Sequence, residues 1–325
     1  MDEPGSAQGY AAARLQVLRS WLAPGRRGGS AKASDVASAD SMSVISIQSQ
    51  VAYGHVGNSA AVFPMQMHGI DVIAVPTTLL SNRPGYPTIR GRVLDAQLVA
   101  DLLLGVEERG ALDTAEAILS GYLGSPEIAA VVADFVERTK ARNPALTYCC
   151  DPVLGDRDRG LFVQADIPRL VRDRLCRLAH IVTPNHFEFE WLCGAKATTI
   201  EGVIAQAQTL ISRGPSTIVV TSAELADTPD GQIETVAVER SQAWRVRTPK
   251  LPISPSGTGD LFTSLLVSAR VRGSDTPDAL GHAASAIFAV LERTAARGTE
   301  EMRIVETATL LAHPKRRFDA IDVRG

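Results

Sequence analysis

Cysteine pairs, long apolar runs and a strong excess of either charge are all lacking in this chain of 325 residues. Its four cysteines, two of them adjacent at Cys149 and Cys150, lack the spacing of a zinc site and are too few for a disulfide scaffold, which favours the reducing cytoplasm. No apolar run approaches the roughly 20 residues of a membrane-spanning helix. The net charge of −3 gives no general basic surface for nucleic acid or an anionic membrane, so a small-molecule partner is expected.

The first 42 residues differ in composition from the rest. Small and polar residues dominate between Gly25 and Ser34, which predicts a flexible arm over residues 1–42. Within it, Ala11 to Leu22 has the spacing of a short amphipathic helix, and Met42 is a natural alternative start. Hydrophobic residues make up 45% of the chain, enough for a sizeable core. Strands and helices alternate without a linker after the arm, which predicts one domain over residues 43–325.

This alternation predicts an α/β fold with a mostly parallel sheet. The first unit is a β-branched strand, a glycine loop, a helix and a second strand, as in a parallel crossover. A polar loop over residues 79–91 is expected to be a lid or an interface. The predicted strands are 44–47, 72–75, 117–119, 146–150, 181–183 and 217–220, with an antiparallel pair at one margin over 233–238 and 243–246. The predicted helices include 96–107, 126–142, 278–292 and 300–311.

The stretch from Ser256 to Val267 carries the clearest chemistry. Gly257 and Gly259 permit tight backbone geometry just before an apolar helical spacing begins, so unpaired N–H groups at the helix start can face one anion. The carboxylate of Asp260 lies in the same turn, ready to accept a proton. A base beside an anion site suits phosphoryl transfer to a hydroxyl. A plain helix cap with an acidic first turn is the alternative.

Several other polar residues follow predicted strands. Ligands of parallel sheets bind beyond the carboxyl ends of the strands. Ser49 follows the first strand and Asp151 follows another, where a carboxylate can hold a metal or its waters. Asn185 and Glu188 lie three apart at a helix start and can hold water or a metal bound to phosphate. The alternatives are loop caps for Ser49 and Asn185, and a turn residue before proline for Asp151.

Taken in order, these stretches resemble the pyridoxal kinases of the ribokinase-like superfamily, over essentially everything after residue 42. The segments that carry the resemblance are Ser46-Ile47-Gln48-Ser49, Tyr53-Gly54-His55-Val56-Gly57-Asn58, Leu80-Ser81-Asn82, Ser120-Gly121-Tyr122, Cys150-Asp151-Pro152-Val153-Leu154-Gly155-Asp156, Thr183-Pro184-Asn185, Val219-Val220-Thr221-Ser222 and Gly257-Thr258-Gly259-Asp260. Gly-Thr-Gly-Asp alone would indicate only the superfamily. The resemblance implies a three-layer α/β/α fold.

The resemblance also implies an activity. The γ-phosphate of ATP would pass to the 5′-hydroxymethyl group of pyridoxal, pyridoxine or pyridoxamine. Asp260 would take the hydroxyl proton, and the N–H groups of Gly257, Thr258 and Gly259 would stabilise the migrating phosphoryl group. A homodimer is typical of such enzymes.

Further residues gain roles from the resemblance alone. Asp151 and Glu188 would hold Mg²⁺ on the triphosphate, with Asp156 and Asn185 nearby. A monovalent cation such as K⁺ commonly assists. The nucleotide-binding positions would be Asp151, Thr183, Asn185, Glu188, Thr221 and Ser222. The positions at the pyridine ring would be Ser49, Tyr122 and Pro84, beside Asp260.

Two positions depart from the family pattern. The family often has Ser-Asn-His-Thr-Gly-Tyr where this chain has Ser81-Asn82-Arg83-Pro84-Gly85-Tyr86, so a threonine hydroxyl near the substrate is absent and an arginine is present. Phe162 replaces a tyrosine that some members place over the nucleotide. Two alternatives to a pyridoxal kinase stay open. One is a hydroxymethylpyrimidine kinase of thiamine synthesis, and the other is a non-catalytic protein that binds a B6 vitamer.

Overall fold

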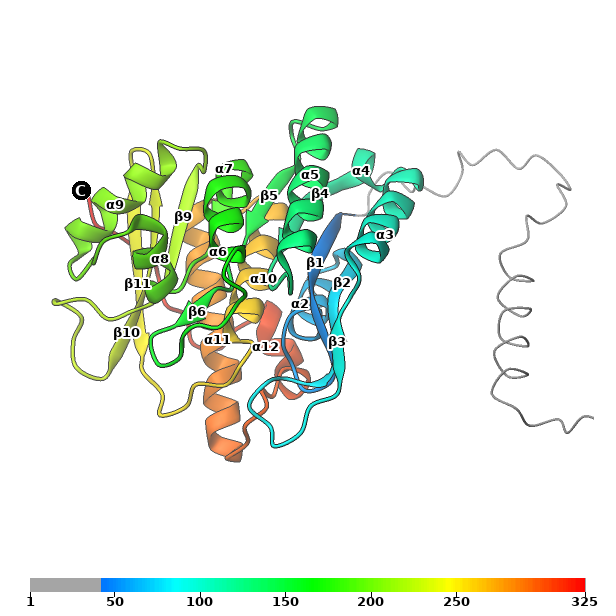
Figure 1. The fold of residues 1–325 in the computed structure, drawn as a ribbon. Coiled ribbons are helices and arrows are strands. Elements are labelled where there is room, and N and C mark those ends of the chain that lie inside the picture. The colour runs from blue at the N-terminus through cyan, green and yellow to red at the C-terminus, as the bar shows by residue number, and fades with distance from the viewer. Residues whose placement is uncertain (1–41, 325) are drawn as a thin grey trace, which may run out of the picture. The chain divides into compact units, whose positions relative to one another are not determined.

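One mostly parallel sheet organises residues 42–324, the part of the chain that the computed structural model describes (Figure 1). Its strands are β1 (Ser43–Tyr53), β2 (Asp71–Asn82), β3 (Gly91–Val93), β4 (Ala115–Ser120), β5 (Thr147–Cys150), β8 (Ile181–Val182), β9 (Thr217–Ala223), β10 (Gln232–Glu239), β11 (Ala243–Pro249) and β12 (Ile321–Asp322). They lie in the order β12-β11-β10-β9-β8-β5-β4-β1-β2-β3. A separate hairpin joins β6 (Gly155–Asp156) to β7 (Gly160–Leu161).

The strands from β2 across to β9 all run parallel. Their carboxyl ends therefore meet at one edge of the sheet, where the loops after β1, β4, β5, β8 and β9 begin. Central strands such as β1 and β4 are buried on both faces because helices cover both sides, so their sequences are apolar runs rather than alternations. The fold class that the sequence predicts is confirmed.

Antiparallel strands lie at both margins, where the sequence predicted only one. The pair β10 and β11 is antiparallel as expected, and β12 extends it. At the other margin, β3 pairs antiparallel with β2. The predicted loop over 79–91 is therefore wrong at both ends, because β2 continues through Asn82 and Gly91 begins β3. Hydrogen bonding to neighbouring strands outweighs the turn-forming residues that suggested a loop.

Helices cover the two faces of the sheet as separate layers (Figure 1). One layer contains α3 (Ala96–Glu108), α4 (Ala111–Thr114), α5 (Pro126–Arg142), α6 (Ile167–Leu170), η1 (Val171–Leu175), α7 (Cys176–Leu178), α8 (His186–Cys193) and α9 (Ile200–Ile211). The other contains α2 (Asn58–Met67), α10 (Thr258–Val271), α11 (Thr276–Arg297), η2 (Val305–Thr307) and α12 (Ala308–Ala312). Each layer packs its own apolar cluster onto the sheet.

The helix predictions are right for α5 in both bounds and for α3 within one residue. The helix predicted over 300–311 is wrong in its first turns, because Glu300 to Ile304 form no helix and only η2 and α12 follow. The predicted arm, apart from Met42, and the helix predicted within it lie outside the described residues.

Candidate active site

The start of α10 is shaped by a glycine in the left-handed region. Gly257 precedes the helix with a φ of 85°, and a Cβ atom there would lie 2.0 Å from the carbonyl oxygen of His55. Only glycine fits this approach. Within residues 42–324, the N–H groups of Gly257, Thr258 and Gly259 make no hydrogen bond outside the helix. They are available to an anion at the positive end of the helix dipole.

Asp260, in the first turn of α10, faces the loop that follows β1. Its Oδ2 accepts the N–H of Gly57 at 2.8 Å. Gly57 has a φ of 55°, and a Cβ atom there would lie 2.1 Å from the carbonyl oxygen of Ser49, so the loop folds tightly onto the strand. Burial raises the pKa of Asp260 to about 6, while the bond from Gly57 lowers it. A carboxylate with this pKa is suited to accept a proton near neutral pH.

Ser49 lies close to the loop that binds this carboxylate, and Tyr122 lies beyond the neighbouring strand β4. Ser49 is buried within β1, at the register shift against β2 and not after the strand as predicted, and its Oγ lies 2.5 Å from where a Cβ atom of Gly57 would be. Tyr122 follows β4 by two residues, and the preceding Gly121 donates its N–H to the carbonyl of Ile47 at 3.1 Å. Burial raises the pKa of the Tyr122 phenol. The backbone of Tyr122 thus lies at the carboxyl edge of the sheet, next to the strand that carries Ser49.

Asp151 reaches the start of α10 from the loop after β5. It is 6% exposed, and its Oδ2 lies 3.8 Å from where a Cβ atom of Gly259 would be. The same oxygen accepts a long hydrogen bond of 3.4 Å from Oγ1 of Thr263. Burial, and then the charges of Glu188 and Asp260, raise the pKa of Asp151 well above its usual range. Asp151 thus feels the charges of two other carboxylates, and the hydrogen bond from Thr263 offsets them only in part.

Glu188 is held by backbone donors at the start of α8. Its Oε1 accepts the N–H groups of Leu154 and Gly155 at 2.7 and 3.2 Å, and its Oε2 accepts the N–H of Asn185 at 2.9 Å. Asn185 in turn accepts the N–H of Glu188, which completes a capping box. Asn185 is thus a cap, as one alternative held, but Glu188 is buried rather than solvated. Burial raises the pKa of Glu188 to about 7.

Asp156 is engaged elsewhere. Its carboxylate accepts the N–H of Arg159 at 2.8 Å and the Nε of the same arginine at 2.7 Å. Among residues 42–324, no group of three or more His, Cys, Asp or Glu side chains could hold a metal ion. A cation at this edge would therefore need ligands from a substrate as well as from Asp151.

The predicted nucleotide positions lie further along the same edge. The Oγ1 of Thr183 accepts a hydrogen bond from Oγ1 of Thr263 at 3.0 Å. Thr221 donates its N–H to the carbonyl of Pro184 at 2.9 Å. Ser222 is exposed with a φ of 55°, at the point where the register of β9 against β10 shifts. A left-handed serine costs about 1–3 kcal/mol, and such strain is found mostly at functional sites.

The two departures from the family pattern take structural roles. The guanidinium of Arg83 turns to Glu301, with Nε 3.0 Å from Oε1, while Pro84 stays exposed in the loop between β2 and β3. Phe162 is 42% exposed, and the guanidinium of Arg159 lies 4.9 Å from its ring centre. The sequence marked both positions, but it did not reveal either contact.

Two residues of this region escaped the sequence analysis. Thr263, which contacts both Asp151 and Thr183, follows Asp260 by three residues, so helical spacing could have placed it on the same face. Glu301 bears no motif, and only the acidic pair Glu300-Glu301 stands there in the sequence.

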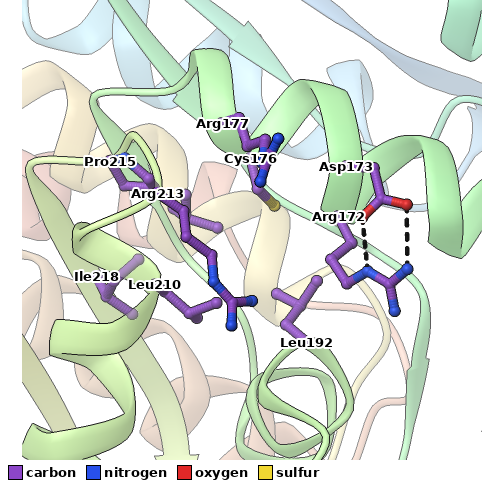
Figure 2. Close-up of a pocket in the computed structure, with 10 residues that line it drawn as sticks. Arg172, Asp173, Cys176, Arg177, Leu192, Leu210, Arg213, Pro215 and Ile218 are labelled. Atoms are coloured by element: carbon purple, nitrogen blue, oxygen red, sulfur yellow. Dashed lines mark hydrogen bonds and ion pairs between the residues drawn. The ribbon is translucent and has the colours of Figure 1, made fainter.

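A hollow elsewhere on the molecule contains none of the predicted residues. It lies between η1, α7 and the ends of α8 and α9, and is lined by three arginines and by apolar side chains that include Leu192, Leu210 and Ile218 (Figure 2). Its arginines include Arg172, which pairs with Asp173.

None of the helices in residues 42–324 has the length and apolar character that a membrane-spanning helix requires.

Known proteins share the fold and much of the sequence. A family model described as phosphomethylpyrimidine kinase matches residues 91–304. Pyridoxal kinase PdxY of Rubrobacter xylanophilus is 44% identical over 85% of this chain and 96% of its own length. The corresponding protein of Leifsonia xyli subsp. xyli is 43% identical over 85% and 98%. The solved pyridoxal kinase of Leishmania donovani in complex with ADP and pyridoxine has a TM-score of 0.80 and 30% identity, covering 86% of this chain and 99% of that one.

Proposed function

This chain belongs to the pyridoxal kinase family, and we propose that it transfers the γ-phosphate of ATP to the 5′-hydroxymethyl group of pyridoxal, and of pyridoxine and pyridoxamine. The product is the 5′-phosphate ester, as needed for vitamin B6 salvage. One observation carries the proposal: the carboxylate of Asp260 lies in the same turn as N–H groups that have no partner outside the helix. This arrangement joins a base to an anion site.

Asp260 acts as the general base in this proposal. It accepts the proton of the substrate hydroxyl as the oxygen attacks the γ-phosphorus, and the bond from phosphorus to the β,γ-bridging oxygen breaks. The N–H groups of Gly257, Thr258 and Gly259 bind the charge on the transferred group. Ser49 and Tyr122 orient the pyridine ring, and Pro84 closes the substrate end. The preorganised N–H groups need not rearrange as charge develops.

The other carboxylates serve the nucleotide. Asp151 has spare acceptor capacity, which fits a cation held by one carboxylate, water and phosphate oxygens. Mg²⁺, when bound there, neutralises charge on the triphosphate. Glu188 orients the loop after Asp151 through Leu154 and Gly155, and reaches the ion only through water. Asp156 would have to release Arg159 to take part.

The remaining nucleotide positions border the same edge and complete the proposal: Thr183, Asn185, Thr221 and Ser222. A monovalent cation such as K⁺ is proposed as a further activator. We also propose a cytoplasmic homodimer; the free thiols of all four cysteines support a reducing compartment. Light scattering during size-exclusion chromatography measures the dimer directly.

Asp260→Asn tests the central assignment. Purified protein should form ADP and the phosphate ester from ATP and pyridoxal. The variant should lose about 10²- to 10⁴-fold in kcat because its amide cannot take the proton. ATP binding should persist. Asp275→Asn, at the N-cap of α11, is the matched control and should retain activity, since asparagine caps as well as aspartate. Normal turnover in Asp260→Asn would contradict the assignment of Asp260 as the general base.

A second candidate deserves a direct comparison because the matching family model is described as phosphomethylpyrimidine kinase. Hydroxymethylpyrimidine resembles pyridoxine in its ring and hydroxymethyl group. Competition between the two substrates in one assay separates the activities. Preference for the pyrimidine would replace the proposed substrate while leaving the role of Asp260 intact.

A further inference from the structure

We propose that Glu301 is a positioning residue for the phosphoryl acceptor site, joining the loop between β2 and β3 to the loop between β1 and α2. This inference rests on the proposed function and deepens it. Neither the sequence motifs nor the comparisons with known proteins mark Glu301. The segment that carries it follows α11, more than 200 residues from both loops in the sequence.

The carboxylate of Glu301 accepts three hydrogen bonds from these two loops. Its Oε2 accepts the backbone N–H of His55 at 3.1 Å. Its Oε1 accepts Nε of Arg83 at 3.0 Å and the phenol of Tyr86 at 2.8 Å. The side chains of Glu301 and Arg83 are only 16% and 13% exposed. This pair is therefore better shielded from water than an ordinary surface ion pair, which contributes little.

The loop after β1 is shaped to receive this carboxylate. Gly54 has a φ of 90°, and a Cβ atom there would lie 2.4 Å from Oε2 of Glu301. The glycine thus lets the backbone lie directly against the carboxylate. The ring of Tyr53 meets the ring of Tyr86 edge to face, with centres 6.0 Å apart, which adds a second contact between the loops.

From the same loop, a short chain of contacts leads to the catalytic base. His55, bound by Glu301 through its N–H, presses its carbonyl against Gly257. Two residues later, the N–H of Gly57 binds Asp260. Next to Glu301 in the sequence, Met302 is buried, and its Cε lies 3.1 Å from where a Cβ atom of Gly257 would be. Glu301 thus fixes the backbone that orients both the base and the anion site.

Arg83 suits this role better than a smaller base would. Its Nε bonds Glu301 while its Nη2 bonds Glu300 at 3.0 Å, and its guanidinium lies 4.6 Å from the ring centre of Tyr86. Only a planar guanidinium presents donors in this fork and stacks on a ring at once. The arginine that replaces the family's usual histidine therefore ties the loop that carries Pro84 to the rest of the site.

Kinetics of Glu301→Ala should separate positioning from simple destabilisation. We expect kcat to fall and the KM for pyridoxal to rise, each by about 10-fold or more, because small misplacements near reacting groups are costly. The KM for ATP should change less than about twofold. Arg83→Ala should raise chiefly the KM for pyridoxal. In the double variant the two effects should not add, because both substitutions break the same link.

Glu306→Gln is the matched control. Glu306 lies in the same C-terminal segment and accepts hydrogen bonds from Arg293 and Arg297, with no contact to either loop. Its variant should weaken the ion pairs of a side chain that is 30% exposed, against 16% for Glu301, but keep wild-type kcat and KM values. Equal kinetic effects in Glu301→Ala and Glu306→Gln, or strict additivity with Arg83→Ala, would overturn the positioning role.

Hydrogen exchange measured by mass spectrometry tests the link without any substrate. The peptide that contains His55 and the peptide that contains residues 83–90 should exchange faster in Glu301→Ala than in the wild type. Both should exchange at the wild-type rate in Glu306→Gln. Unchanged exchange in Glu301→Ala would reject the inference even if the kinase is active. An inactive wild type with faster exchange in the variant would instead reject the proposed function and retain the link.

Discussion

The two halves of the active-site edge are held together in different ways. In the proposed acceptor half, comprising Asp260, Gly57, Ser49 and Tyr122, the carboxylate of Asp260 binds a loop 203 residues away in the sequence. In the proposed nucleotide half, comprising Asp151, Asn185, Glu188, Thr221 and Ser222, the capping box joins Asn185 to Glu188 across three residues. The first half therefore depends on contacts between segments that are distant in the sequence. The second half depends largely on a local helix start.

This difference teaches where each half is vulnerable. Capping interactions form within one turn of helix and depend little on distant segments. The contact between Asp260 and Gly57 exists only when α10 and the loop after β1 have docked. We therefore expect changes in the acceptor half to affect kcat broadly, and changes in the nucleotide half to affect ATP binding more selectively.

Gly257→Ala should have the largest effect. A Cβ atom would enter the left-handed region at about 1–2 kcal/mol and clash with the carbonyl of His55, so the loop must move away from Asp260. We expect kcat to fall at least about 100-fold. Gly259→Ala is the comparison, because a Cβ atom there meets nothing closer than Oδ2 of Asp151 at 3.8 Å. Equal losses of kcat and thermal stability in both variants would break the contrast between the two positions.

The pH dependence of the acceptor half should follow Asp260. Its pKa is raised to about 6, mainly by burial, and the base must be ionised to accept a proton. The value of kcat/KM for pyridoxal should therefore be half its maximum near pH 6 and fall about tenfold per pH unit below that. A profile that stays flat down to pH 4.5 would argue against this base.

Glu188→Gln should sharpen the contrast from the other half. The side-chain NH₂ of glutamine would point a donor at the N–H of Asn185 or of Leu154, which now binds a carboxylate oxygen. Leaving that buried N–H without an acceptor costs about 1–3 kcal/mol of stability. We expect a rise of several-fold in the KM for ATP, with a smaller change in the KM for pyridoxal. Glu190→Gln, on the same helix and bonded to Lys196, is the control and should leave both KM values unchanged.

The same variant should also alter the stability profile with pH. The pKa of Glu188 in the folded protein is raised from 4.5 to about 7, so the folded state holds this proton more tightly than the unfolded chain. The contribution to the free energy of unfolding is complete below pH 4.5 and is lost as the pH rises through 7. Urea unfolding between pH 5 and 8 should show a shallower decline in Glu188→Gln than in the wild type.

A histidine pair outside both halves should give the smallest effect. Nε2 of His68 lies 3.1 Å from Nε2 of His282, and burial lowers the pKa of His282 to about 4. The unfolded chain thus binds a proton that the folded protein does not, and stability falls as the pH drops from 6.5 toward 4. In His282→Gln this slope should lessen while kcat and both KM values at pH 7.5 stay unchanged. A changed kcat or KM in His282→Gln would contradict this prediction and would show that the histidine pair affects the acceptor half.

The local half was the more predictable from sequence. Asn185 and Glu188 lie three apart at a predicted helix start, and Asp151 follows an apolar strand, so the sequence places all three at the carboxyl edge of the sheet. The engagement of Asp156 by Arg159 was missed, although the two lie only three residues apart. The loop that the sequence predicts between β2 and β3 is too long, because local composition does not reveal strand pairing with a neighbour.

By itself, the sequence determined the α/β class, the alternation of strands and helices that predicts a mostly parallel sheet, and the turn that carries Asp260. Hydrophobic periodicity and the backbone freedom of glycine are both properties of a few neighbouring residues. Only the tertiary structure decided that Gly57 binds this carboxylate, that Arg83 turns to Glu301, and that Asp151 is buried where the charges of Glu188 and Asp260 reach it. Those contacts depend on how distant segments pack, and no short stretch of sequence contains that information.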